Sequence, residues 1–170
     1  GYAYPFIEPD LLARQLPYLT CLAPFTYGIN AFGGLLPLAD GALLAAARKR
    51  GAAPVMHLST LTESGQFDTQ RAELVLSDSM VQDRLVSDVL QTVIQRGYAW
   101  VDVDFEYLPG DLADAYAAFL SRLRQLLRPQ GRFLWAALAP KTGPQQRGLL
   151  YEGHDYVAVS AASDAVLLMT

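Results

Sequence analysis

The chain has 170 residues, which is enough for one domain with its own core but short for two. Hydrophobic residues make up 52% of the chain and charged residues 18%, a composition typical of a folded domain. Its net charge of −4 and its scattered lysines and arginines argue against a nucleic-acid partner. No apolar run approaches the roughly 18 residues of a membrane span, so no membrane partner is expected, and the single cysteine, Cys21, excludes a disulfide within the chain.

Apolar runs bounded by turn residues alternate with segments of helical periodicity along the whole chain. We expect strands at residues 1–6, 19–27, 54–60, 99–107, 133–138 and 165–170. We expect helices at residues 9–16, 40–50, 77–96, 111–127 and 148–163, with Gly51 and Gly97 as C-terminal caps. This alternation predicts an α/β fold of repeated βα units with a parallel sheet that is covered on both faces.

The segment 77–96 has the clearest helical period. Its apolar residues form one stripe, which predicts packing against the core rather than a cofactor site. The stripe consists of Met80, Val81, Leu85, Val89, Leu90, Val93 and Ile94. The polar stretch 61–68 that precedes this region is expected to be a surface loop.

The chain begins in one predicted strand and stops in another, with no polar tail at either end. A parallel sheet of six strands that ended there would leave unprotected apolar edges, through which copies could associate. We therefore expect residues 1–170 to be part of a larger domain.

The stretch YAWVDVDFEYL, residues 98–108, carries Asp102, Asp104 and Glu106 at alternate positions. Successive side chains of a strand point to opposite faces, so the three acids share one face. An antiparallel strand with its acids in water would explain this pattern. The neighbouring βα units favour the other reading, in which helices cover the apolar face and the acids point into the mouth of a barrel.

Carboxylates crowded into a partly dry interior cannot all ionise, because both like charge and desolvation favour the protonated form. One of the three acids could then keep a proton near neutral pH. That property is required of a general acid that protonates the leaving oxygen of a glycosidic bond.

The D-x-D-x-E run of Asp102, Asp104 and Glu106 resembles the fourth-strand signature of glycoside hydrolase family 18, the chitinase-like (β/α)8 barrels. The segments DFEYLPGDLADAYAAFLSRLR, ALAPKT, GLLYEGHDY and VLLMT are similar to the spore-cortex-lytic, or spore-germination, branch of that family, and LAPFTYGI is similar to its second strand. The resemblance covers essentially the whole chain. It implies a TIM-type barrel with about six of its eight βα units in residues 1–170.

The resemblance also implies a role for each acid. Glu106 would protonate the glycosidic oxygen. Asp104 would hold the substrate's 2-acetamido group, whose carbonyl oxygen attacks the anomeric carbon, and Asp102 would share a proton with Asp104. The substrate thus supplies its own nucleophile, which is an exception to the two-carboxylate scheme. The family carries no metal or organic cofactor, so none is expected.

The implied reaction is hydrolysis, with retention, of β-1,4 bonds after N-acetylglucosamine. The implied partner is a glycan, either spore-cortex peptidoglycan or, as second choice, chitin oligomers, and the implied location is the bacterial spore or the cell exterior. The alternatives are a non-catalytic, chitinase-like glycan-binding module and an inactive barrel fragment. The presence of Glu106 favours an enzyme, because such binding homologues commonly lose this residue.

Two departures from the family pattern stand out. Ala99 and Trp100 occupy positions where the motif usually opens with Asp-Gly, and they are expected to change packing rather than catalysis. A Tyr-Asp pair that normally follows the sixth strand lies beyond Thr170, as do the last two strands.

Residues at other predicted strand ends complete the expected site. Tyr27 and Tyr4 end the second and first strands, where an aromatic ring could stack on a sugar, although a core position is an equal alternative for Tyr27 and the more common one for Tyr4. Ser59 ends the third strand, where either a pocket role or a loop hydrogen bond would suit it. Tyr107 follows the acidic motif and is expected over the mouth.

The two histidines are expected to be structural. His57 alternates with Val55 and Ser59 on the third strand and is expected to be a hydrogen-bonded interior residue. His154 lies in the GHDY segment on a connecting helix or loop. Two histidines this far apart, with one cysteine, give no metal-ligand spacing, so no metal site is expected.

Overall fold

The computed structural model describes residues 1–170 and contains one six-stranded sheet in the order β1-β2-β3-β4-β5-β6. Every neighbouring pair of strands is parallel, as the alternation of elements predicted. The strands are β1 (Tyr2–Ala3), β2 (Cys21–Pro24), β3 (Ala53–Ser59), β4 (Trp100–Asp104), β5 (Phe133–Leu138) and β6 (Ala165–Leu168). The antiparallel alternative for the acidic strand is therefore excluded.

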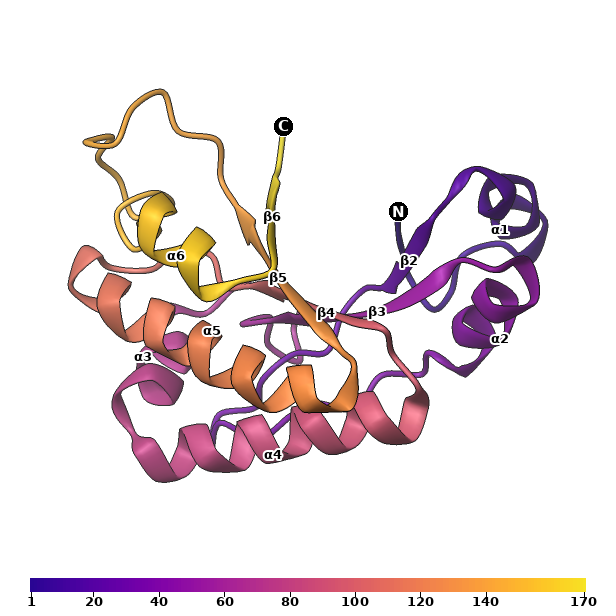
Figure 1. Ribbon diagram of the computed structural model, residues 1–170, viewed down its shortest axis with the longest axis horizontal. Coiled ribbons are helices and arrows are strands. Elements are labelled where there is room, and N and C mark those ends of the chain that lie inside the picture. The colour runs from indigo at the N-terminus through magenta and orange to yellow at the C-terminus, as the bar shows by residue number, and fades with distance from the viewer.

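Helices connect successive strands along the outside of the curved sheet, while both chain ends lie on the opposite side (Figure 1). The α-helices are α1 (Pro9–Gln15), α2 (Gly41–Arg50), α3 (Thr69–Ser77), α4 (Ser79–Arg96), α5 (Ala113–Leu127) and α6 (Tyr156–Ala162). Short 3-10 turns add η1 (Leu16–Tyr18), η2 (Gly110–Leu112) and η3 (Arg128–Gln130). None of the helices combines the length and the apolar character that crossing a membrane would need.

Helix ends follow the predicted caps where glycine closes a helix. Gly51 and Gly97 have φ angles of 76° and 65°, the left-handed conformation that glycine adopts without steric penalty. Each donates its backbone N–H to carbonyls of the last helical turn. The helix predicted at 148–163 is shorter than expected and occupies only α6.

The predicted helix 77–96 corresponds to α4, and a helix that was not predicted, α3, precedes it. Asp78 stands between α3 and α4 in an extended conformation, and its carboxylate accepts hydrogen bonds from the backbone N–H groups of Met80 and Val81. This N-cap separates α4 from α3, which the sequence analysis did not predict. The predicted apolar stripe was also wrong at its ends, because Met80 and Ile94 are exposed at 78% and 48%.

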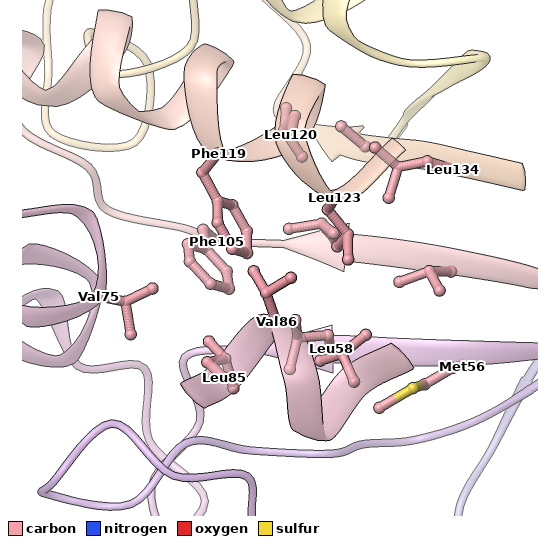
Figure 2. Close-up of a cluster of buried hydrophobic side chains, with 14 of the residues drawn as sticks. Met56, Leu58, Val75, Leu85, Val86, Phe105, Phe119, Leu120, Leu123 and Leu134 are labelled. Atoms are coloured by element: carbon pink, nitrogen blue, oxygen red, sulfur yellow. The ribbon is translucent and has the colours of Figure 1, made fainter. Parts of the chain in front are cut away.

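The main core lies between the outer face of the sheet and helices α3, α4, α5 and α6. Val101 and Val103 of β4 and the following Phe105 are fully buried there, as predicted for the apolar face of this strand. Phe105 stacks on Tyr116 and Phe119 of α5, with ring centroids 5.8 and 5.5 Å apart. Figure 2 shows Phe105 beside Phe119, with Leu85 and Val86 of α4 close by. This packing fixes β4 from its outer side and turns its acids inward.

Candidate active site

The acids of β4 point to the inner face of the sheet, opposite the helices. Asp102 and Asp104 are buried within β4, which ends at Asp104, while Glu106 lies two residues beyond the strand and is half-buried. The three carboxylates therefore follow one another from the interior toward the C-terminal end of the sheet, where parallel α/β sheets place their binding sites.

Asp102 is the deepest of the three acids. Its Oδ2 accepts a hydrogen bond of 2.6 Å from the hydroxyl of Tyr2 on β1, and its Oδ1 has no hydrogen-bond partner. Burial raises the pKa of Asp102 to about 6, and the negative charge of Asp104 adds to the increase. The same surroundings raise the pKa of Tyr2, which stays a neutral donor.

Glu106 stands at the opening of the site beside Asp104. Burial, followed by the charge of Asp104, raises the pKa of Glu106 to about 7. A carboxyl group with this pKa holds a proton over much of the mildly acidic range and can give it up near neutrality, which suits a general acid/base.

A cavity of about 350 Å³ opens over the acids. Asp104, Glu106 and His57 provide its polar lining. The rest of the lining is apolar or aromatic, namely Tyr2, Ala3, Tyr4, Phe25, Phe67 and Met169. A few convergent polar groups surrounded by aromatic rings are typical of a pocket for a small organic ligand or sugar.

Of the four aromatic or polar residues predicted to bind substrate, one lines this cavity. Tyr4 does so, and its ring stacks on that of Phe6 with centroids 4.9 Å apart. Tyr107 is exposed at the edge of the site, where its ring contacts Phe67 edge-on at 5.9 Å. Tyr107 therefore touches the lining without being part of it.

Two predicted site residues lie elsewhere. Tyr27 is buried among the helices on the outer side, and its hydroxyl donates to Asp40 at 2.5 Å, so the prediction that it faces substrate was wrong. Ser59 is fully buried, and its hydroxyl accepts from the N–H of Leu61 at 3.3 Å and lies 3.2 Å from that of Thr26. Ser59 thus takes the loop hydrogen bond, the second of the two roles considered for it.

His57 is the site residue whose importance the sequence analysis missed. It is buried and hydrogen-bonded as expected, yet it lines the cavity, and its Nε2 lies 3.4 Å from Asp104 Oδ2 and 3.9 Å from Asp102 Oδ2. The signal would have been the register between strands, which pairs His57 with Asp102 and Ser59 with Asp104.

The loop that carries Glu106 is held by three hydrogen bonds from distant segments. His154 donates through Nε2 to the carbonyl of Phe105 at 2.8 Å, and Thr69 donates to the carbonyl of Tyr107 at 3.0 Å. The N–H of Gly153 donates to the carbonyl of Leu108 at 3.0 Å. Burial lowers the pKa of His154, and its hydrogen bond to the carbonyl of Phe105 gives it the structural role that was predicted.

The described residues contain no group of three or more His, Cys, Asp or Glu side chains arranged to hold a metal ion.

Comparisons with known proteins found relatives in sequence and in fold. The chain is 33% identical over 156 residues to the cortical fragment-lytic enzyme of Bacillus subtilis, an alignment that covers 91% of the chain and 36% of that enzyme. The crystal structure of the spore cortex-lytic enzyme SleL of Bacillus megaterium matches 100% of the chain with a TM-score of 0.94 and 29% identity, over 41% of its own length. No family model matches the chain.

A class V chitinase from Pseudomonas fluorescens has the same fold. It matches 99% of the chain and 53% of its own length with a TM-score of 0.86 and 24% identity. The chain spans little more than a third of the length of the curated relative and about two fifths of the solved SleL structure.

Proposed function

We propose that the chain belongs to glycoside hydrolase family 18 and forms the first six strands, with the five helical connections between them, of an eight-stranded barrel domain. The support is the fit to the SleL structure over the whole chain, together with a curved, all-parallel sheet whose helices lie on one side. Two further βα units would pair with β6 and β1 and close the barrel.

Within that domain, the proposed activity is hydrolysis of β-1,4 bonds after N-acetylglucosamine. The observation that carries this proposal is Glu106, a half-buried carboxyl with a pKa of about 7 that lines an aromatic cavity beside Asp104. The D-x-D-x-E spacing of the family places its proton donor at this position.

In the proposed reaction Glu106 gives its proton to the glycosidic oxygen as the bond from that oxygen to the anomeric carbon breaks. The carbonyl oxygen of the substrate's own 2-acetamido group attacks the same carbon and forms an oxazolinium ion. Asp104 accepts a hydrogen bond from the acetamido N–H and stabilises the positive charge. Glu106 then takes a proton from the water that attacks the anomeric carbon and opens the oxazolinium ring. Because the anomeric carbon is inverted twice, the configuration is retained.

Asp102 and the aromatic lining have supporting roles in this scheme. Asp102, with a pKa of about 6, lies behind Asp104 on the same strand face and can share a proton with it. Tyr4, Phe25 and Phe67 present rings on which the faces of a sugar can stack.

Spore-cortex peptidoglycan is the proposed substrate. This choice rests on the two relatives that are named for cortex lysis, at 33% and 29% identity. The chitinase match is too distant in sequence to argue for a chitin substrate. The proposed partner is therefore a glycan chain that contains N-acetylglucosamine.

The deciding experiment compares the protein, in the form that its gene encodes, with its Glu106→Gln variant. Cortex fragments are supplied and the release of reducing ends is measured. Glu106→Gln is expected to lower kcat/KM by about 10²- to 10⁴-fold, because the amide has no proton to transfer. Glu73→Gln makes the same change on the exposed face of α3 and is expected to leave the rate unchanged.

The pH dependence gives a second readout. The rate should fall as pH rises through the pKa of Glu106 at about 7, because the acid loses its proton. It should fall again below the pKa of Asp102 at about 6, because a protonated Asp102 no longer adds negative charge beside Asp104 and the oxazolinium ion. If the natural protein releases no reducing ends while Glu106→Gln binds the same glycan equally well, the protein is a binding module and not a hydrolase.

A further inference from the structure

His57 lies beside the acids, yet the proposed mechanism assigns it no role. It is 1% exposed, and its Nε2 faces Oδ2 of Asp104 at 3.4 Å and Oδ2 of Asp102 at 3.9 Å. Histidine on β3 is the register partner of Asp102 on β4, so both side chains project toward the same inner face.

The imidazole ring is held in a single orientation. Oγ1 of Thr26 lies 2.5 Å from Nδ1, and the ring stacks on Phe25 with centroids 4.7 Å apart. Tyr2 contacts the ring edge-on at 5.2 Å. Nε2 faces carboxylate oxygens, which only accept when ionised, so Nε2 carries a proton whether the ring is neutral or charged.

No lysine or arginine pairs with these acids. The titratable groups that face His57 are Tyr2 on β1, Asp102 and Asp104 on β4, and Glu106 after β4. The ion pairs formed by Asp102 and Asp104 involve His57 and no lysine or arginine.

We propose that His57 is a positioning residue that acts through Asp102 and Asp104, orienting both carboxylates with its Nε2–H and supporting their negative charge. The proposal rests on the proposed hydrolysis and assigns to it a residue outside the D-x-D-x-E motif. Thr26 is a second positioning residue, because the hydrogen bond between its hydroxyl and Nδ1 of His57 directs Nε2 toward the acids.

Loss of His57 should change the pH profile in a defined direction. The charge of His57 opposes the increases in pKa that burial causes at Asp102 and Glu106. Without it the pKa of both acids rises, so both limbs of the kcat/KM profile should move to higher pH by up to about one unit. On the acidic limb, a shift of one unit lowers kcat/KM about tenfold at constant pH.

The experiment measures kcat and KM between pH 4 and pH 9 for an aryl glycoside of an N-acetylglucosamine oligomer, with the protein in the form that its gene encodes. His57→Phe keeps a ring that can stack on Phe25 and removes both nitrogens. His57→Gln keeps an N–H donor near the position of Nε2 without a charge. We expect both variants to shift the profile, and the glutamine variant to keep a several-fold higher maximal rate.

Thr26→Val provides an independent test if the phenylalanine variant fails to fold. It should shift the profile in the same direction by a smaller amount, since the ring is no longer held at Nδ1. An unchanged pH profile in His57→Phe overturns the proposal. Where that variant does not fold, an unchanged pH profile in Thr26→Val overturns it. A His57→Gln variant that is no faster than His57→Phe also overturns it. A natural protein with no more activity than Glu106→Gln instead overturns the proposed function.

Discussion

Asp102 illustrates how a single residue of the proposed site opposes the stability of the fold. The carboxyl is fully buried, its Oδ1 has no partner, and its pKa is about 6 instead of the usual 3.8. A shift of about two units corresponds to about 3 kcal/mol. The folded state binds this proton more tightly than the unfolded chain does. Protonated Asp102 therefore favours folding by this amount below pH 4, and the contribution is lost as pH rises through 6.

Asp102→Asn should therefore stabilise the protein at neutral and higher pH. At pH 8 the free energy of unfolding is expected to rise by about 1 to 3 kcal/mol, since the amide needs no charge in the interior. At pH 4, where Asp102 is already protonated in the folded state, the gain should disappear. Urea unfolding at the two pH values checks this, and a variant that is less stable than the natural protein at pH 8 contradicts it.

The sequence predicts the direction of the acids but not the contacts of the other site residues. Alternation along one strand was enough to place Asp102, Asp104 and Glu106 on one face, because side-chain direction on a strand depends only on local geometry. The role of His57 and the position of Tyr27 depended on contacts between distant segments. Tyr27 follows β2 and turns outward to Asp40, which no local pattern indicates.

At the scale of elements, one buried carboxylate joins four of them. Asp40, at the N-terminus of α2, accepts hydrogen bonds from Tyr27 after β2, Tyr98 before β4 and Arg96 at the end of α4. Asp40 is 0% exposed. Removing it would leave the buried hydroxyl groups of Tyr27 and Tyr98 without their partner, whereas the Arg96 side chain is 43% exposed and can be solvated.

Asp40→Ala is accordingly expected to lower the free energy of unfolding by about 2 to 5 kcal/mol, mainly through the two unpaired hydroxyl groups. Asp83→Ala is the matched control, because Asp83 pairs with Arg122 on the surface and both side chains are well exposed. The control should lose less than about 1 kcal/mol. Equal losses in the two variants, measured by chemical unfolding, would mean that the Asp40 cluster is no more than a surface-type contact.

The segment before α6 has a second connecting role, because it supports the loop that carries Glu106. A Cβ atom on Gly153 would lie 2.2 Å from Cβ and 2.6 Å from the carbonyl oxygen of Leu108, so Gly153→Ala must push this loop away. We expect kcat of the proposed hydrolysis to fall by about tenfold or more with a smaller effect on KM, since a displaced acid still permits binding.

Gly143→Ala is the control for this prediction, because a Cβ there meets nothing within 4 Å. It should retain the kinetic constants of the natural protein. A Gly153→Ala variant with unchanged kcat would show that the loop tolerates displacement and that Glu106 does not depend on it.

Element boundaries were predictable where capping chemistry is local. The glycine caps of α2 and α4 and the bounds of β5 agreed with expectation, since each depends on a short stretch of sequence. Helix α3 was missed because the turn-rich stretch before it indicated a loop. Asp68, which accepts from the N–H of Gln70 and begins that helix, was the available signal.

At the scale of the whole molecule, the sheet presents two open edges. β1 and β6 each pair with one neighbour only, and their apolar side chains are exposed, with Tyr2 at 45%, Val166 at 41% and Leu168 at 48%. In the proposed eight-unit barrel these edges would be covered by the two further βα units. A protein made of residues 1–170 alone would keep them open, and unpaired strand edges promote association between copies.

A protein consisting of residues 1–170 should therefore self-associate with concentration, as measured by sedimentation equilibrium. Val166→Lys places a charge on the β6 edge and is expected to raise the dissociation constant by at least about tenfold, because the charge would be desolvated in an edge-to-edge contact. Met80→Lys introduces the same charge at the start of α4, where the side chain is 78% exposed and the helix connects the central strands β3 and β4. This control should leave the association unchanged. A monomer at every concentration would mean that the edges are already protected within residues 1–170. Equal effects of the two lysines would mean that association does not use the β6 edge. Either result would contradict the argument that two more βα units are needed to cover the edges.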